Sequence, residues 1–172
     1  MLLKVSLVRD VIAPSRAHPT DAGIDFRTPK LDDRFVEDLL GKKGNERINV
    51  DNETKSIIIP PGENACIPSG VKIEIPYGFM GMFTNKSGFC SQKDGLVGGG
   101  IIDTFYSGEV HLDIHNIGTQ NLVIKEGDKI AQLIMVPILS CDITQCDESS
   151  LYDWMSQDTI RGTDGFGSTD KK

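Results

Sequence analysis

Residues 95–110, GLVGGGIIDTFYSGEV, hold the densest group of chemically useful features in the chain. The glycines at 98–100 have no Cβ, so they permit positive φ and let another group approach the backbone closely. An acid and a phenol, Asp103 and Tyr106, follow three positions apart. The stretch predicts a β-hairpin with a mouth lined by backbone groups and a carboxylate at its base. A glycine-rich turn with a solvated aspartate is the simpler alternative.

Two further segments carry groups that suit phosphate. Residues 85–88, NKSG, combine the cation of Lys86, the hydroxyl of Ser87 and the approachable amide of Gly88. An ordinary polar turn is the alternative interpretation of this tetrapeptide. Near the end of the chain, RGTDGFGS at 161–168 offers an arginine fork, glycine amides, hydroxyls and one aromatic ring. The alternative there is a disordered, low-complexity tail.

Phosphoryl transfer to water needs a base and, usually, a divalent cation on the phosphates. Asp103 and Asp25 are the acids of interest, although Asp25 also suits a turn residue that bonds its own backbone. Gln132 lies inside the apolar stretch 129–134. A buried amide is costly unless it is hydrogen-bonded, so Gln132 has either a structural partner or a ligand.

These residues must be positioned by strands, because short apolar runs separated by proline and glycine turns fill most of the chain. Strands are expected near 2–8, 57–59, 71–75, 79–84, 110–115, 122–124 and 130–138. The last run is long and apolar apart from Gln132, and it indicates a strand buried on both faces. The regular spacing of strands and turns predicts an all-β sandwich or barrel.

Residues 29–56 differ from the rest and are interpreted as an insertion between strands. Within them, residues 31–41 place apolar side chains on one helical face, with aspartate near the start and Gly41 at the end, which predicts a short amphipathic helix. The charged run at 42–55 suits a surface excursion. The insertion is too short to bury a core of its own.

Length and composition exclude several classes of protein. A chain of 172 residues suits one domain, or one domain with a tail. The net charge of −7 argues against a nucleic-acid binder. There is no apolar run of membrane-spanning length and no signal segment, so we expect no membrane association and a cytoplasmic or otherwise intracellular protein. The four scattered cysteines form no CxxC pair and suit reduced thiols.

Five stretches, in this order, resemble the motifs of the homotrimeric deoxyuridine triphosphatases (dUTPases). They are Ala22–Phe26, Lys86–Gly88, Gly100–Gly108, Gly127–Leu133 and Arg161–Ser168. The resemblance implies an all-β, jelly-roll-like distorted barrel with a short helix in the insertion. It also implies a homotrimer with active sites at the subunit interfaces, and Mg²⁺-dependent hydrolysis of dUTP to dUMP and pyrophosphate.

The resemblance also implies roles for single residues. Asp103 orients the water that attacks the α-phosphorus, Tyr106 packs against the deoxyribose, and Asp25 reaches Mg²⁺ through water. The uracil edge pairs with the backbone around Gly100, Ile101 and Ile102. The phosphate ligands are Lys86, Ser87, Gly88 and Gln132. The tail adds Arg161, Gly167 and Ser168 for the nucleotide, with Ser168 and Arg161 on the terminal phosphates and Phe166 stacked on uracil.

By the same resemblance, residues 1–150 form the domain that includes the insertion, and residues 151–172 form a mobile, glycine-rich C-terminal arm that closes over an active site. Three departures from the family pattern matter. Lys86 stands where arginine is usual and Asn85 where proline is usual, so the phosphate contact has a point charge instead of a fork. Val97 stands where the family often has asparagine. Asp113 lies ten residues after Asp103, near the place of a catalytic glutamate in the related dCTP deaminases.

Two alternatives to simple dUTP hydrolysis therefore stay open at this point. One is deamination of dCTP, alone or coupled to hydrolysis, with Asp113 as the acid. The other is a trimeric scaffold that uses the insertion at 29–56 to bind a partner. We expect the insertion to be decoration.

Overall fold

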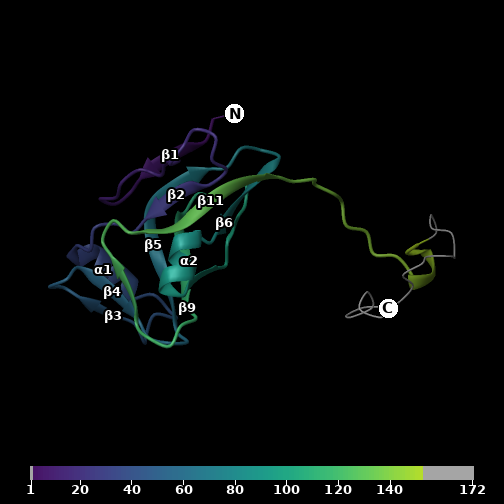
Figure 1. Ribbon diagram of the computed structural model, residues 1–172. Helices are drawn as coiled ribbons and strands as arrows, with labels where there is room; N and C mark the ends of the chain where they lie inside the picture. The colour runs from purple at the N-terminus through teal and green to yellow at the C-terminus, as the bar shows by residue number, and fades with distance from the viewer. Residues whose placement is uncertain (1, 153–172) are drawn as a thin grey trace. The chain divides into compact units, whose positions relative to one another are not determined.

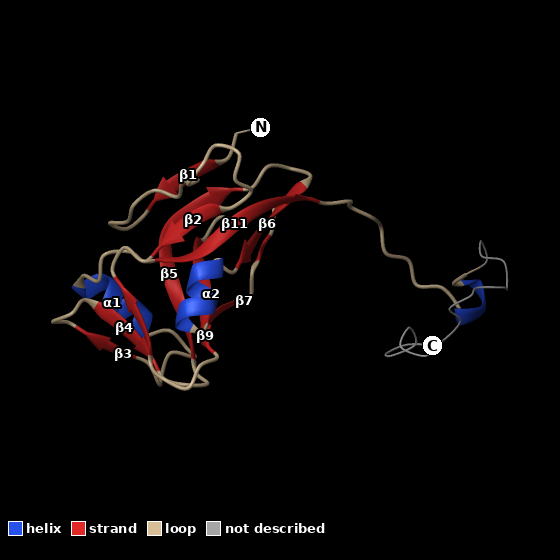
Figure 2. Ribbon diagram, in the orientation of Figure 1, coloured by secondary structure: helices blue, strands red, loops and turns tan. Residues whose placement is uncertain are grey.

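The computed structural model describes residues 2–152. This part of the chain is mostly β, with two short α-helices (Figures 1 and 2). The strands are β1 (Lys4–Leu7), β2 (Ile24–Arg27), β3 (Asn49–Asp51), β4 (Ser56–Ile59), β5 (Asn64–Glu74), β6 (Phe79–Thr84), β7 (Gly95–Gly98), β8 (Ile101–Ile102), β9 (Glu109–Asn116), β10 (Leu122–Lys125) and β11 (Lys129–Pro137). The helices are α1 (Asp33–Leu40) and α2 (Ser87–Lys93), followed by a short 3₁₀ turn, η1 (Glu148–Ser150).

The strands form three antiparallel sheets, in the orders β1-β5-β9-β7, β10-β4-β3 and β2-β11-β6-β8. Their inward faces meet in one apolar core. Strand β9 illustrates the principle, because alternate residues of a strand point to opposite faces. Val110, Leu112 and Ile114 are buried, and the residues between them are only partly covered. The expected all-β fold with a short helix in the insertion is confirmed.

The chain divides into two compact units, Met1–Leu139 and a second that begins at Ser140. All the sheets and both α-helices belong to the first unit. The division into a domain at 1–150 and an arm at 151–172 stays a prediction, since only the first two residues of that arm lie in the described part of the chain. Within residues 2–152, no helix has the length and apolar character needed to span a membrane.

Helix α1 is built as the sequence predicts. The carboxylate of Asp32 accepts a hydrogen bond from the backbone N–H of Phe35 (2.8 Å) and caps the helix start. Phe35 and Leu39 are buried, together with Leu31 before the helix. The insertion therefore contributes side chains to the apolar core of the domain.

Three local expectations were wrong. Strands β7 and β8 do not form a hairpin with each other, since β7 pairs with β9 and β8 pairs with β6 in another sheet. The segment at 85–88 is not an isolated turn, because Lys86 is the N-cap of α2. Strand β11 is deeply buried only in its first half, and from Ile134 to Val136 it is partly exposed.

Candidate functional site

Asp25 lies at the centre of a charged cluster on sheet β2-β11-β6-β8. Its side chain is buried, and each carboxylate oxygen faces an ammonium group. Lys86 Nζ donates to Oδ1, and Lys129 Nζ lies 2.6 Å from Oδ2. The cluster thus holds two positive charges against one negative charge. Lys129 belongs to the fourth motif, but sequence reasoning did not single it out, because nothing local pairs it with Asp25.

The two lysines determine the protonation state of Asp25. Burial of the carboxylate favours its neutral form, but the hydrogen bonds from Lys129 and Lys86 and the charges of these two groups outweigh that effect. The pKa of Asp25 is therefore held below its ordinary value. A carboxylate that stays ionised beside two ammonium groups forms a compact, net-cationic group that can attract an anion.

Gln132 lies beside this cluster. Asp25 on β2 is the register partner of Gln132 on β11, which in turn pairs with Thr84 on β6. The amide nitrogen of Gln132 donates to the backbone carbonyl of Asn85 (2.8 Å). A Cβ at Gly23 would come within 2.0 Å of the Gln132 side-chain oxygen, so glycine at this position leaves space for the amide. The structure thus brings together Asp25, Lys86 and Gln132, which come from three separate motifs.

Ser87 and Gly88 are exposed in the first turn of α2, directly after Lys86. A Cβ at Gly88 would meet open space, so no intramolecular crowding requires glycine there. The three predicted phosphate residues of the second motif therefore lie at the surface next to Gln132 and Asp25.

Asp103 and Tyr106 lie together in a different place. Both line a hollow of about 230 Å³ with Ile101, Ile102 and His111. The Tyr106 hydroxyl donates to the carbonyl of Glu109 (3.0 Å), and its backbone N–H donates to the carbonyl of Asp103 (3.3 Å). Asp103 is exposed. The hollow therefore presents a solvent-accessible carboxylate next to an aromatic ring whose position is fixed at both ends.

Two glycines are required to build this hollow. A Cβ at Gly108 would come within 2.5 Å of the Tyr106 hydroxyl oxygen. A Cβ at Gly100 would come within 2.4 Å of the carbonyl oxygen of Phe83, whose N–H donates to the Gly100 carbonyl (2.6 Å). The absence of side chains at these positions lets β6 and the ring of Tyr106 lie against the segment that carries Asp103.

His111 is a residue of this hollow that the sequence did not reveal. Its Nε2 lies 2.7 Å from Nζ of Lys42, which belongs to the insertion. Burial lowers the pKa of His111, and the nearby charge of Lys42 lowers it further. The insertion therefore reaches the wall of the Asp103 hollow. The alternation of polar and apolar residues in β9 places His111 on the outward face, but the contact with Lys42 has no signal in the sequence.

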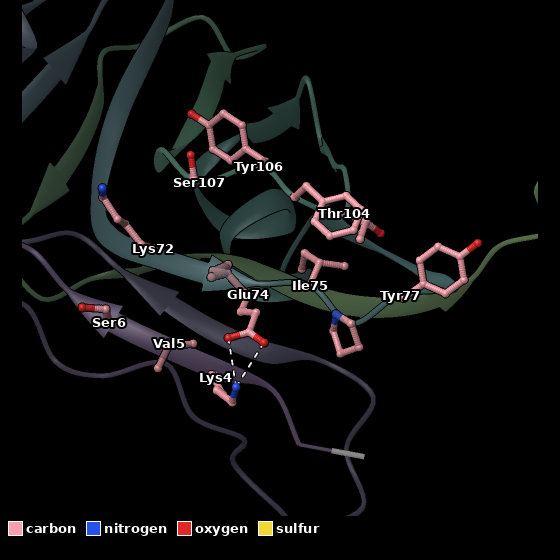
Figure 3. A pocket seen from close by; sticks show the side chains of 13 residues that line it. Lys4, Val5, Ser6, Lys72, Glu74, Ile75, Tyr77, Thr104, Tyr106 and Ser107 are labelled. Carbon is pink, nitrogen blue, oxygen red and sulfur yellow. Dashed lines mark hydrogen bonds and ion pairs between the residues drawn. The ribbon is translucent and has the colours of Figure 1, made fainter.

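A larger hollow of about 530 Å³ adjoins the same segment (Figure 3). Tyr106 lines this hollow too, together with Phe105, Tyr77 and Val5. Phe105 and Tyr77 are 87% and 82% exposed, which is unusual for such large aromatic side chains. The charged groups at its rim include the ion pair between Lys4 and Glu74 (3.1 Å).

The two groups of site residues are separated within one chain. Ile102, next to Asp103, pairs with Gly81 on β6, and Gly81 pairs with Met135 on β11. Gln132 lies three residues away along β11, and three residues of a strand span about 10 Å. Neither the 230 Å³ hollow nor the 530 Å³ hollow is lined by Asp25, Lys86 or Lys129.

Asp113, the candidate acid of the deaminase alternative, makes side-chain contacts away from the Asp103 hollow. Its carboxylate accepts from Asn64 Nδ2 (2.8 Å) and contacts His115 Nε2 (2.9 Å). It does not line the hollow that contains Asp103. The structure therefore gives Asp113 local partners and adds nothing in favour of deamination.

The predicted tail residues Arg161, Phe166, Gly167 and Ser168 lie outside the described residues. Within residues 2–152, no cluster of three His, Cys, Asp or Glu side chains could hold a metal. Both oxygens of Asp25 already accept from ammonium groups, so a direct bond to a metal does not fit. Contact through water does fit, because a carboxylate has further lone pairs and Mg²⁺ usually keeps several waters and binds substrate phosphates.

Comparisons with known proteins by family model, by sequence and by structure all indicate the same family. The family model described as dUTPase matches residues 52–170. A deoxyuridine 5'-triphosphate nucleotidohydrolase of Gloeothece citriformis is 30% identical over 172 residues, which cover 98% of this chain and 97% of the relative. The solved structure of the Staphylococcus bacteriophage 80alpha dUTPase with dUPNHPP has a TM-score of 0.72 and 25% identity, covering 97% of each chain. A mutant dUTPase from phage phi11 of S. aureus, whose structure describes the coordination of a structural Mg(II) ion, has a TM-score of 0.67 and 25% identity over 86% of this chain and 98% of that one.

Proposed function

This chain belongs to the dUTPase family and hydrolyses dUTP, and on this premise we propose that Asp103 activates the attacking water. The observation that carries the proposal is the hollow in which the exposed carboxylate of Asp103 lies beside the ring of Tyr106. A base must be accessible to water and close to the reacting group, and Asp103 meets the first condition without any rearrangement.

The proposed reaction is a single displacement at the α-phosphorus. Asp103 accepts a proton from the water as the water oxygen forms its bond to phosphorus. The bond between the α-phosphorus and the bridging oxygen breaks, and pyrophosphate leaves with that oxygen, giving dUMP. Tyr106 packs against the deoxyribose and leaves no space for a 2′-hydroxyl. The backbone of residues 100–102 pairs with the uracil edge. These backbone groups are accessible because position 100 is a glycine.

The phosphates are bound by the second group of residues. Lys86 and Gln132 contact them, together with the hydroxyl of Ser87 and the backbone of Gly88. The support for this assignment is that Lys86 and Gln132, although far apart in sequence, both adjoin the Asp25 cluster. Asp25 would reach Mg²⁺ through water, and the ion, when bound, neutralises charge on the phosphate oxygens. The tail adds Arg161, Gly167 and Ser168, with Arg161 and Ser168 on the terminal phosphates, and Phe166 covers the base.

The active site is assembled from more than one subunit of a homotrimer. A water held by Asp103 must lie within about 3–3.5 Å of the phosphorus it attacks. The phosphate ligands of the same chain lie about 10 Å or more away by strand register. A neighbouring subunit would bring its own Lys86 and Gln132 to the Asp103 hollow. The exposed aromatic residues Phe105 and Tyr77 beside Tyr106 are a surface that a second copy of the chain would cover.

A substrate panel tests the assignments together. Purified protein is incubated with dUTP, dTTP, dCTP or UTP, with and without Mg²⁺, and release of pyrophosphate and ammonia is measured. We expect rapid Mg²⁺-dependent release of pyrophosphate from dUTP, and at least about 100-fold slower release from the others, as expected where a site pairs with substrate polar groups. Equal turnover of UTP would contradict the role of Tyr106. Ammonia release from dCTP would instead favour the deaminase alternative, with Asp113 as its acid.

A further inference from the structure

The side chain of Asn85 joins the end of β6 to the edge of a different sheet. Its amide oxygen Oδ1 accepts a hydrogen bond from the backbone N–H of Val97 (2.7 Å), twelve residues further along the chain. Its backbone carbonyl accepts from Nε2 of Gln132 (2.8 Å). Asn85 also directly precedes Lys86. Asn85 therefore contacts both β7, which leads to the glycines at 98–100, and Gln132, one of the proposed phosphate ligands.

Strand β7, which contains Val97, needs such support. Among the strands of residues 2–152, it is the edge of its sheet and pairs only with β9. An edge strand leaves backbone amides without ladder partners, and the carbonyl of Asn85's side chain satisfies one of them. After Gly98 the chain crosses into the other sheet through residues without side chains, and Gly99 has φ +50°. Glycines add no side-chain packing, so the close backbone contacts and the hydrogen bonds at its two ends hold this segment in position.

The other end of this segment is fixed by Phe83. Phe83 lies two residues before Asn85 in the chain, and its backbone N–H donates to the Gly100 carbonyl (2.6 Å). The glycines at 98–100 are thus held between two bonds that both originate from residues 83–85. A shift of Asn85 would move the start of this crossing, while Phe83 retains its end.

We propose that Asn85 is a positioning residue for dUTP hydrolysis, which fixes β7 and the glycine crossing relative to Lys86 and Gln132. The inference depends on the proposed roles of residues 100–103, but the hydrogen bond itself does not. It also connects two positions that depart from the family pattern, Asn85 and Val97. A proline at position 85 would have no side-chain acceptor for the backbone N–H of residue 97, so this bond depends on the asparagine at position 85.

The proposal is tested with Asn85→Ala, which removes the acceptor, and Asn85→Asp, which keeps an oxygen at the same place. Asn52→Ala, in the exposed turn after β3, is the matched control. Hydrogen exchange of the Val97 amide is measured for each variant. Loss of one hydrogen bond is expected to speed this exchange about tenfold in Asn85→Ala. Exchange at Ile114 and Ile124, in the core, is expected to stay unchanged.

Turnover supplies the second measurement. We expect kcat/KM for dUTP to fall about 3- to 10-fold in Asn85→Ala, mainly through kcat, and to recover in Asn85→Asp. Unchanged exchange at Val97 would show that the bond does not hold β7, and faster exchange with normal kcat would show a merely structural role. Either result overturns the proposal. If Asn85→Ala does not fold, Asn85→Gln, which displaces the oxygen by one carbon, supplies the same two measurements.

These outcomes can be distinguished from a failure of the proposed mechanism. If Asp103 is not the base, substitution of Asp103 leaves turnover near normal, whatever Asn85 does. The exchange rate at Val97 reports the Asn85 bond in the absence of any substrate. A protein in which Asp103 is dispensable but Asn85→Ala still lowers kcat would retain the positioning role and lose only the assigned base.

Discussion

Two aspartates of this protein have opposite environments, and this contrast supports different roles for them. Asp103 is exposed in a hollow beside Tyr106, where it can meet water. Asp25 is buried between two ammonium groups that keep it ionised. Environments that separate the behaviour of two acids are a general sign of distinct functions. Asp103 is suited to accept a proton, and Asp25 is suited to organise charge.

The role of Asp103 predicts the effect of Asp103→Asn. The amide keeps the shape of the side chain but cannot accept a proton, so kcat should fall by about 10²- to 10⁴-fold. Because the side chain is exposed, the melting temperature should change little. Initial rates of pyrophosphate release, with thermal unfolding as the control for folding, measure both. Near-normal turnover of a folded Asp103→Asn protein would exclude the residue as the base.

The ion pairs of Asp25 predict a pH-dependent loss of stability in Asp25→Asn. The pKa of Asp25 is lowered in the folded protein, so its contribution to stability is complete above the ordinary value of 3.8 and is lost as the pH falls through the lower, folded value. At pH 7 the variant should be less stable by roughly 1.5–3 kcal/mol, the usual cost of a lost bond between charged groups. Denaturant titrations between pH 7 and pH 3 measure this difference.

The difference between wild type and Asp25→Asn should therefore shrink below the ordinary carboxyl pKa. Asp10→Asn is the matched control, since Asp10 is exposed and 3.7 Å from its lysine partner. It should show no comparable difference at any pH. A cost of Asp25→Asn that is independent of pH would show that the lysines do not stabilise the ionised carboxylate.

At the scale of elements, the insertion at 29–56 is integrated into the fold by apolar packing and by ion pairs. Helix α1 packs against β5, and Phe35 and Leu39 are fully covered. Arg9 links the helix to β9, because its guanidinium lies 2.7 Å from Asp38 and 2.8 Å from Glu109. The guanidinium carbon of Arg9 also lies 5.8 Å from the centre of the Phe35 ring.

Substitution of Phe35 by alanine should consequently destabilise the whole domain. Phe35 is 1% exposed, and removal of a buried aromatic side chain costs about 3–5 kcal/mol. Leu40→Ala in the same helix is the matched control, since Leu40 is 45% exposed and should cost less than about 0.5 kcal/mol. Equilibrium unfolding in urea measures both variants. A small cost for Phe35→Ala would show that the packing of the insertion does not stabilise the domain.

The contact between Lys42 and His111 predicts an acid-sensitive link between the insertion and β9. Burial and the charge of Lys42 lower the pKa of His111 in the folded protein. The contribution of neutral His111 to folding stability is therefore complete above the ordinary pKa of 6.5. It is lost as the pH falls from 6.5 through the folded pKa. Lys42→Met removes one of these causes and raises the pKa of His111. The melting temperature should then fall less between pH 7.5 and pH 5.5 than in wild type, while the exposed neighbour change Lys43→Met should leave the wild-type drop intact.

Much of this architecture could be predicted from the sequence, because the deciding signals are local. The alternation of Val110, Leu112 and Ile114 predicts β9, and the aspartate and glycine at its two ends predict α1. Helix α2 was missed because its seven residues bury only Phe89, which leaves no helical pattern of apolar residues. The pairing of β7 and β8 in separate sheets depends on contacts with β9 and β6, and a local pattern does not encode them.

The candidate site, like the fold, could be predicted from the sequence only in part. The residue types at positions 25, 86, 103, 106 and 132 could be selected from the sequence, since each stands in a motif. Their grouping could not, because the bond between Lys129 and Asp25 and the contact of Lys42 with His111 each join distant parts of the chain. The positioning contact of Asn85 with Val97 was hidden for a further reason. Both positions looked like separate departures from a pattern, and only the fold places them side by side.

For the whole molecule, the separation between the Asp103 hollow and the Asp25 cluster is the decisive feature. Strand register places Gln132 about 10 Å along β11 from the row that contains Ile102. In the proposed function, a complete site therefore combines Asp103 of one subunit with Lys86 of another. In a closed, symmetric trimer each interface is equivalent, so three such sites form.

Mixing two inactive variants tests this account most directly. Asp103→Asn and Lys86→Met subunits are unfolded together, refolded at equal amounts and assayed for pyrophosphate release from dUTP. If the site is shared, each mixed trimer contains one intact site, and activity should return to about a quarter of wild type. Mixing Asp103→Asn with Asp103→Ala, which carry the defect at the same position, should restore nothing. A mixture of the first pair that stays as inactive as its two components would contradict a site shared between subunits.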